Sequence, residues 1–352
     1  MWKKMVNAIS LMLIVGACKE YRHLDVLEFG TEYELHTELL SLNALMITYP
    51  FDMFVTDEHI YILGIYNNKW VHCFDRLSGK YIDSFVSVGR GPGEVISCTK
   101  MTYDTKLRKL YLYDSSTEKL LSYSISENQT KIDFEDEILF QELEEPVVLY
   151  QIWPLSDHTL LVNSQSGSME EGLTRFQILT NTGEQICTCS DMPDLTIEDR
   201  YTYLQSTMTL SPDRTHLASV TLMGEILEIY ELSDMSITRS VEKIYSYPNI
   251  SFRDGVVWET DDTIWGFPFV CSDNRYIYAA MTNDKRPNNF NKIAVFDWSG
   301  SGVLKLTTDY NILRLTPYEG KIYSIVANSF NELFIAKYDF DRLINECNHE
   351  RL

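Results

Sequence analysis

The densest group of chemically distinctive residues is the run from Val88 to Glu94, which reads Val-Gly-Arg-Gly-Pro-Gly-Glu. Three glycines beside an arginine are similar to a phosphate-binding loop, but that loop needs a following helix to supply backbone amides and a helix dipole. Residues 95–103 instead have the pattern of a strand. We therefore predict a structural loop in which glycine supplies backbone freedom and proline supplies stiffness. Its members are Gly89, Gly91, Pro92 and Gly93.

A second candidate group lies in the segment 247–266, which contains Trp258 and Trp265 among several carboxylates. Aromatic faces beside acidic groups suit a sugar or a peptide ligand. They suit equally a hydrophobic plug with a solvated rim, and both interpretations stay open here. In the segment 194–205, apolar residues recur at helical spacing, which predicts a short helix. The candidate ligand-binding residues are Arg90, Glu94, Tyr201, Trp258 and Trp265.

Catalytic motifs are not found in the chain. It contains no G-x-S-x-G, H-E-x-x-H or P-loop sequence, and its 7 histidines never stand at metal-ligand spacing with the cysteines. Apart from Cys18, the six cysteines permit disulfides in an oxidising compartment, but their settings are typical of core or edge residues. We therefore assign no catalytic residue and predict no cofactor.

The N-terminus has the three parts of an export signal. Lys3 and Lys4 precede a mostly apolar run, 5–17, which at about 1.5 Å per residue is too short to cross a bilayer core of about 30 Å. The run ends in Val-Gly-Ala before Cys18, which resembles the lipobox of bacterial lipoproteins, where the cysteine carries the lipid. We predict a signal peptide over 1–17, a lipid on Cys18 and a tether over 18–36. The alternative is an ordinary secretory signal followed by a chance cysteine.

Charge excludes one class of partner. The chain has 51 acidic against 30 basic residues, a formal net charge of −21. A field of that sign repels phosphate backbones, so nucleic acid is excluded as a partner. Adsorption to an anionic bilayer by charge alone is disfavoured for the same reason, so membrane attachment depends on the lipid.

An internal repeat sets the fold class. A polar turn, a short apolar strand and a second apolar strand recur six times, and the equivalent positions are Tyr61, Tyr111, Leu161, Ala218, Tyr278 and Tyr323. The steps between them are 50, 50, 57, 60 and 45 residues, which suits four-stranded propeller blades. We predict an all-β, six-bladed β-propeller of antiparallel blades over residues 37–352. Since no strand follows Tyr338, the segment Leu39–Leu45 is expected to supply the last outer strand and close the ring.

The repeat, the lipobox-like run and the Gly-Arg-Gly-Pro-Gly-Glu segment together resemble the TolB-like (NHL-like) six-bladed propeller lipoproteins of Gram-negative anaerobes. Members of that family commonly have Phe after the glutamate, where this chain has Val95. The resemblance covers essentially the whole mature chain. It implies the propeller fold and a lipoprotein of the outer membrane, on its periplasmic or its outer side. It implies little about activity, because fold does not dictate function.

Loop lengths indicate which face of the propeller binds. In a four-stranded meander, the second-to-third and blade-to-blade connections emerge on one face, and there the loops are long. They are the segments 89–94, 164–174, 191–205, 247–266 and 283–291. Long loops on one face of a repeat usually mark the binding face.

The function predicted from these features is a lipid-anchored binding or scaffold propeller of the cell envelope. Its partner is expected to be a peptide, a glycan or an envelope protein. The alternative is a metal-assisted hydrolase or lyase with its site in the central channel, for which calcium is the cation considered.

Overall fold

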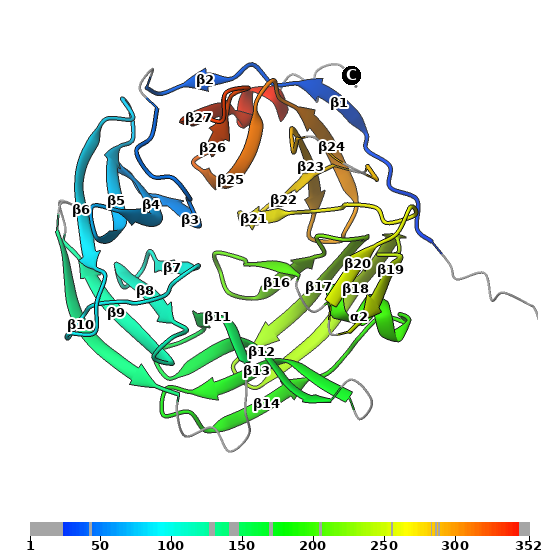
Figure 1. Ribbon diagram of the computed structural model, residues 1–352, viewed down its shortest axis with the longest axis horizontal. Coiled ribbons are helices and arrows are strands. Elements are labelled where there is room, and N and C mark those ends of the chain that lie inside the picture. The colour runs from blue at the N-terminus through cyan, green and yellow to red at the C-terminus, as the bar shows by residue number, and fades with distance from the viewer. Residues whose placement is uncertain are drawn as a thin grey trace, which may run out of the picture.

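The computed structural model describes the chain except for residues 1–23, 42–43, 127–130, 141–147, 169–171, 204–205, 255, 283, 286, 288 and 345–352. Six sheets radiate from a common centre and form a disc (Figure 1). The predicted six-bladed β-propeller is confirmed. Cys18 and Cys347 lie outside the described residues, and so does the predicted signal peptide.

Each blade is an antiparallel meander that runs from an inner to an outer strand. Blade 1 contains β3 (Asp52–Val55), β4 (His59–Tyr66), β5 (Lys69–Asp75) and β6 (Tyr81–Ser87), and blade 2 contains β7 (Met101–Asp104), β8 (Lys109–Asp114), β9 (Lys119–Ile125) and β10 (Ile132–Leu139). Blade 3 contains β11 (Val148–Pro154), β12 (Thr159–Ser168), β13 (Gly172–Thr180) and β14 (Gln185–Cys189), and blade 4 contains β15 (Thr207–Leu210), β16 (His216–Val220), β17 (Glu225–Ser233) and β18 (Ser236–Ser246). Blade 5 contains β21 (Phe269–Ser272), β22 (Tyr276–Met281), β23 (Lys292–Asp297) and β24 (Gly302–Thr307), and blade 6 contains β25 (Asn311–Tyr318), β26 (Lys321–Ala327) and β27 (Leu333–Asp339).

Burial along the strands follows their position in the blade. In β4, the four residues Ile60–Leu63 are all fully buried, because both faces of a middle strand pack against neighbouring blades. The outer strand β18 instead alternates exposed and half-buried residues. Local turn chemistry agrees with this pattern: Asn67 and Asn68, between β4 and β5, both have positive φ, as a tight primed hairpin turn requires.

The ring is closed by the N-terminal segment, as the sequence predicts. Strand β2 (Glu38–Leu39) pairs antiparallel with β27 as the outermost strand of blade 6. The contact continues beyond the strand, where the Leu45 N–H donates to the Leu333 carbonyl at 2.7 Å. Closure covers the edge of β27 and joins the two ends of the repeat.

The segment 18–36, predicted as a tether, is partly docked on the propeller. Strand β1 (Thr31–Glu34) pairs in parallel with β24 and gives blade 5 a fifth strand, seen at the rim of the disc in Figure 1. Further upstream, Asp25 accepts from the Ile244 N–H at 2.9 Å and forms an ion pair with Lys243 at 3.0 Å. Residues 25–34 therefore form a strap across blades 4 and 5. No helix in the described part of the chain is long and apolar enough to span a membrane.

Candidate functional site

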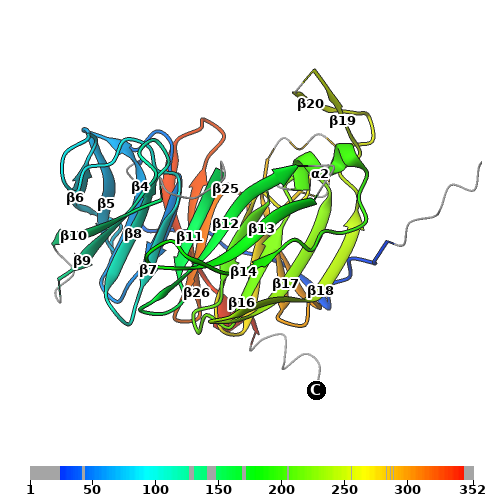
Figure 2. The same ribbon diagram turned by 90° about the horizontal axis from the view of Figure 1, so that it is seen from below.

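Two faces of the disc differ in their loops. Because strand direction alternates in each blade, the second-to-third and blade-to-blade connections share one end of the strands, which we call the long-loop face. The opposite end is the short-loop face. Figure 2 shows the helix α2 (Ile197–Tyr203) and a two-stranded hairpin, β19 (Ile250–Arg253) with β20 (Val256–Glu259), on the same side of the disc. The predicted short helix in 194–205 is confirmed.

Helix α2 and the hairpin are joined on the long-loop face. The Asp199 carboxylate of α2 accepts from the Ile250 N–H at the start of β19, at 3.3 Å. The base of the hairpin is also tied together, since the Thr260 and Thr263 hydroxyls both donate to the Asn249 carbonyl, at 2.6 and 2.8 Å. These contacts hold the hairpin in one orientation above the blades.

The loop between β22 and β23 reaches the same assembly. Lys285 forms an ion pair with Asp262 at 2.9 Å, and the Trp265 N–H donates to the Asp284 carbonyl at 2.9 Å. Trp265 is half-buried in this junction. Two of the predicted long loops, 191–205 and 283–291, thus contact a third, 247–266, and together they come from blades 3 to 5.

Two apolar side chains of the hairpin face solvent. Trp258 is 57% exposed and Val256 is 50% exposed. The side chain of Tyr201, the third aromatic candidate, lies outside what the structure describes. An exposed Trp on a hairpin that neighbouring loops hold in place can act as an anchor that a partner buries on binding.

A buried charge cluster beneath α2 was not anticipated from the sequence. Arg175 of β13 and Glu228 of β17 form an ion pair at 2.5 Å with both side chains fully buried. The Tyr203 hydroxyl of α2 donates to the same carboxylate at 2.6 Å, and Arg239 pairs with it at 3.0 Å. Burial alone would raise the pKa of Glu228, but Arg175, Tyr203 and Arg239 together lower it below its usual value. The cluster fastens α2 to blades 3 and 4.

The glycine-rich loop lies apart from this assembly, between blades 1 and 2. The Val88 N–H donates to the Asn68 carbonyl, and the Gly91 N–H donates to the Glu94 carboxylate at 2.8 Å. Gly93 has a φ of 68°, and a Cβ there would lie 2.7 Å from Phe134 of β10. Glu94 thus braces its own loop, while Arg90 is exposed. Neither shares a blade with Trp258 or Trp265.

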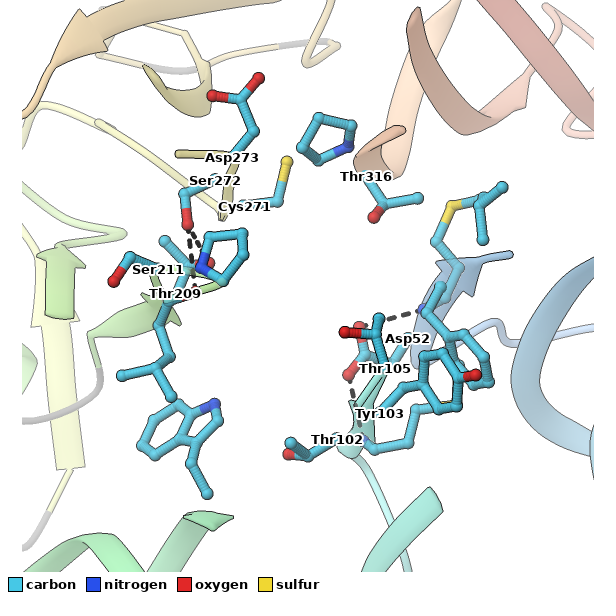
Figure 3. Close-up of a pocket in the computed structure, with 18 of the residues that line it drawn as sticks. Asp52, Thr102, Tyr103, Thr105, Thr209, Ser211, Cys271, Ser272, Asp273 and Thr316 are labelled. Atoms are coloured by element: carbon cyan, nitrogen blue, oxygen red, sulfur yellow. Dashed lines mark hydrogen bonds between the residues drawn. The ribbon is translucent and has the colours of Figure 1, made fainter. Parts of the chain in front are cut away.

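A cavity of about 440 Å³ occupies the centre of the disc and is lined by all six inner strands. Hydroxyl, carboxylate and aromatic side chains surround its open middle (Figure 3). Polar side chains link neighbouring blades around it: the Met101 N–H donates to Asp52 at 3.1 Å, the Thr102 hydroxyl donates to the Ile152 carbonyl at 3.1 Å, and Thr209 shares a hydrogen bond with a serine of blade 5. The sequence signal was the presence of at least one polar residue in each inner strand.

At the short-loop face, the charged side chains at the end of the cavity have ion-pair or hydrogen-bond partners within the protein. Asp104 forms an ion pair with Arg214, which also donates to the Leu155 carbonyl at 3.1 Å. Asp273 accepts from two backbone N–H groups at 2.7 Å and from the Tyr278 hydroxyl at 2.9 Å. These carboxylates are therefore oriented by the protein itself.

The lining of the cavity also includes the thiol of Cys271. Burial raises the pKa of the Cys271 thiol well above its usual value, so it is a poor nucleophile. Among the residues described, no group of three or more His, Cys, Asp or Glu is placed to hold a metal ion. The five cysteines in the described part of the chain carry free thiols.

The fold and the central cavity define a six-bladed propeller with a polar channel. Residues 29–318 match the family model for TolB-like 6-blade propeller-like proteins, and the chain belongs to that family. No curated protein sequence matches the chain significantly.

Solved structures with the same fold are distant in sequence. A Bacteroides fragilis protein described as a candidate exported protein is 14% identical with a TM-score of 0.57, covering 89% of this chain and 99% of that one. A DUF4221-family protein of Bacteroides vulgatus is 11% identical with a TM-score of 0.53, covering 87% and 98%. The calcium-binding protein regucalcin of Agrobacterium tumefaciens is 11% identical with a TM-score of 0.50, covering 88% and 97%. Identities this low show the fold alone.

Proposed function

We propose that this protein is a lipid-anchored binding propeller of the cell envelope that holds a protein partner on its long-loop face. The observation that carries the proposal is the braced hairpin β19–β20, which presents Trp258 and Val256 to solvent. A protein surface suits this epitope better than a small molecule does, because the hairpin is a projection and not a concavity.

Several features support a binding role in preference to a catalytic one. The hairpin, α2 and the β22–β23 loop brace each other through Asp199, Asp262 and Lys285, so little conformational entropy is lost when a partner binds. Exposed aromatic side chains on rigid elements are the usual anchors of protein interfaces. The family and the similarity in fold to an exported protein agree with a place in the envelope.

The lipid anchor is the second half of the proposal. The lipobox-like run before Cys18 supports it, together with the basic and apolar residues upstream. Cys18→Ala is expected to leave an uncleaved precursor or to release the protein from membranes, measured by detergent partitioning after fractionation. If the variant partitions with the membrane fraction as a processed protein like the wild type, the anchor is refuted.

The hairpin is tested by photo-crosslinking in intact cells. A photoreactive phenylalanine analogue in place of Trp258 should give a covalent adduct with one predominant envelope protein. The matched control is the same analogue in place of Leu77, which is 77% exposed on the short-loop face. Absence of an adduct at position 258, or the same adducts at both positions, would refute binding through the hairpin.

A further inference from the structure

At the end nearest the long-loop face, the central cavity contains a lysine whose ammonium group has no partner among the described residues. Lys100 immediately precedes β7, so it lies at the end of the channel nearest the long-loop face, and it lines the cavity. No residue in the described ranges forms a hydrogen bond or ion pair with its ammonium group. Cys271 of blade 5 lines the same cavity, across the channel from blade 2.

Two charged residues near Lys100 already have partners. Asp52 also lines the cavity, and its carboxylate accepts from the Met53 and Met101 N–H groups at 3.0 and 3.1 Å. Arg314 of β25 does not line the cavity; it donates to backbone carbonyls and lies over the Phe269 ring at 4.3 Å. Lys100 and Asp52 are therefore the charged side chains that line this end of the cavity, and of these the Lys100 ammonium group is the one without a partner in the described ranges.

The end at the short-loop face is negative. Four carboxylates and two arginines surround it, and they are Asp57, Asp104, Asp273, Glu319, Arg76 and Arg214. The charge around the cavity therefore changes from negative at this end to balanced at the other, where Lys100 stands beside Asp52. A ligand that carries several negative charges would be repelled by the carboxylates, whereas a chain with one terminal carboxylate can place that group at Lys100 and its cationic or hydroxyl groups beside the acidic end.

The wall between the two ends offers hydrogen bonds to an extended backbone. Gln151 and Thr316 line the cavity, and their side-chain polar groups have no partner among the described residues. Thr102 donates its hydroxyl proton to the Ile152 carbonyl, so its lone pairs remain available to accept. The channel follows the disc axis, and each inner strand turns one edge of backbone N–H and C=O groups toward it.

We infer that this channel captures the C-terminal end of an extended peptide, which enters carboxylate first from the short-loop face and places its terminal carboxylate at Lys100. Basic or hydroxylated residues just upstream would then lie beside the acidic mouth. Capture of a terminal carboxylate is a recognised mode of peptide binding. This second site lies on the axis, and none of its lining residues belongs to the hairpin, so its test does not depend on the crosslinking result.

The test compares two pools of fluorescein-labelled hexapeptides whose last four residues are randomised. One pool ends in a free carboxylate and the other in a carboxamide, and binding to the mature protein is followed by fluorescence anisotropy. The acid pool should bind about tenfold more tightly than the amide pool, because one charge-assisted contact is lost in the amide. Lys100→Met should remove that preference, while Lys106→Met, an exposed lysine on the β7–β8 turn, should not.

Each remaining outcome overturns the inference. Equal binding of the two pools, binding of neither, or an unchanged preference in Lys100→Met would show that the terminal carboxylate is not read at Lys100. Glucuronate is included as a second carboxylate source, and Lys100-dependent binding of glucuronate without binding of the acid pool would assign the channel to an acidic sugar. The acid-to-amide comparison uses the wild-type protein, so it remains decisive even if Lys100→Met fails to fold.

Discussion

Replacing Glu225 by Gln should change how the stability of the protein depends on pH. Glu225 begins β17 and is only 3% exposed, and one of its carboxylate oxygens has no hydrogen-bond partner in the described structure. Opposite it on β18, the Ser246 hydroxyl also has none. Burial raises the pKa of Glu225 to about 7, from an ordinary value of 4.5. The folded protein therefore binds this proton more tightly than the unfolded chain does.

The sign and size of the effect follow from that shift. The stabilising contribution of protonated Glu225 is fully present below about pH 4.5 and is lost as the pH rises through 7, because the charged form must then be buried without a partner. At about 1.4 kcal/mol per pKa unit, the loss is about 3 kcal/mol between pH 4.5 and pH 8. Gln stays neutral, so the free energy of unfolding of Glu225→Gln relative to the wild type should rise by that amount over this range.

The assay is urea unfolding, followed by tryptophan fluorescence, of the mature protein and its variants at several pH values. Glu231→Gln is the matched control, because Glu231 lies on the same strand but is exposed. Its difference from the wild type should be nearly constant with pH. Parallel pH profiles for the wild type and Glu225→Gln would refute the reasoning, since they would mean that the carboxylate is as well solvated or as well paired in the folded protein as in the unfolded chain.

Three further perturbations test the packing that positions the two candidate sites. Arg175→Met should lower the free energy of unfolding by about 3–5 kcal/mol, because it leaves a buried carboxylate without its main partner; a loss below 1 kcal/mol in urea unfolding would contradict this. Deleting residues 19–46 should sharply lower the melting temperature by removing the strap and the closing strand, whereas deleting 19–23 should not; equal melting temperatures would argue against closure. Gly93→Ala should cost about 2 kcal/mol, because its φ is positive and the new methyl group would overlap Phe134; an unchanged denaturation midpoint would show that the loop relaxes freely.

The architecture was predictable from the sequence because it depends on patterns among residues that are close together along the chain. Alternating apolar residues, turn residues at regular intervals and six equivalent strands between Tyr61 and Tyr323 each depend on neighbours along the chain. Closure by the segment Leu39–Leu45 was predicted by counting strands, because the last blade lacked an outer strand. The strap was missed because β1 alternates polar residues such as Glu32 and Glu34, which resemble a solvated tether until a partner strand is known.

The candidate sites were only partly predictable. Loop length drew attention to the long-loop face, where the hairpin presents Trp258. The loop with Arg90 and Glu94 is also a blade-to-blade connection on that face, but it lies between blades 1 and 2, away from the hairpin. Helical spacing predicted α2. In the structure it is Tyr203, two residues after the candidate Tyr201, that binds the buried cluster.

What only the tertiary structure decided are the features made by side chains from different blades. The Arg175–Glu228 pair joins residues 53 positions apart, and Lys100 of blade 2 and Cys271 of blade 5 line the same cavity. Along the chain these residues are isolated polar groups in apolar strands, with no shared period or motif. The sequence determines each strand through residues that are close together along the chain. The buried charges exist only when blades 3 and 4 pack together, and the channel exists only after all six blades have closed on one axis.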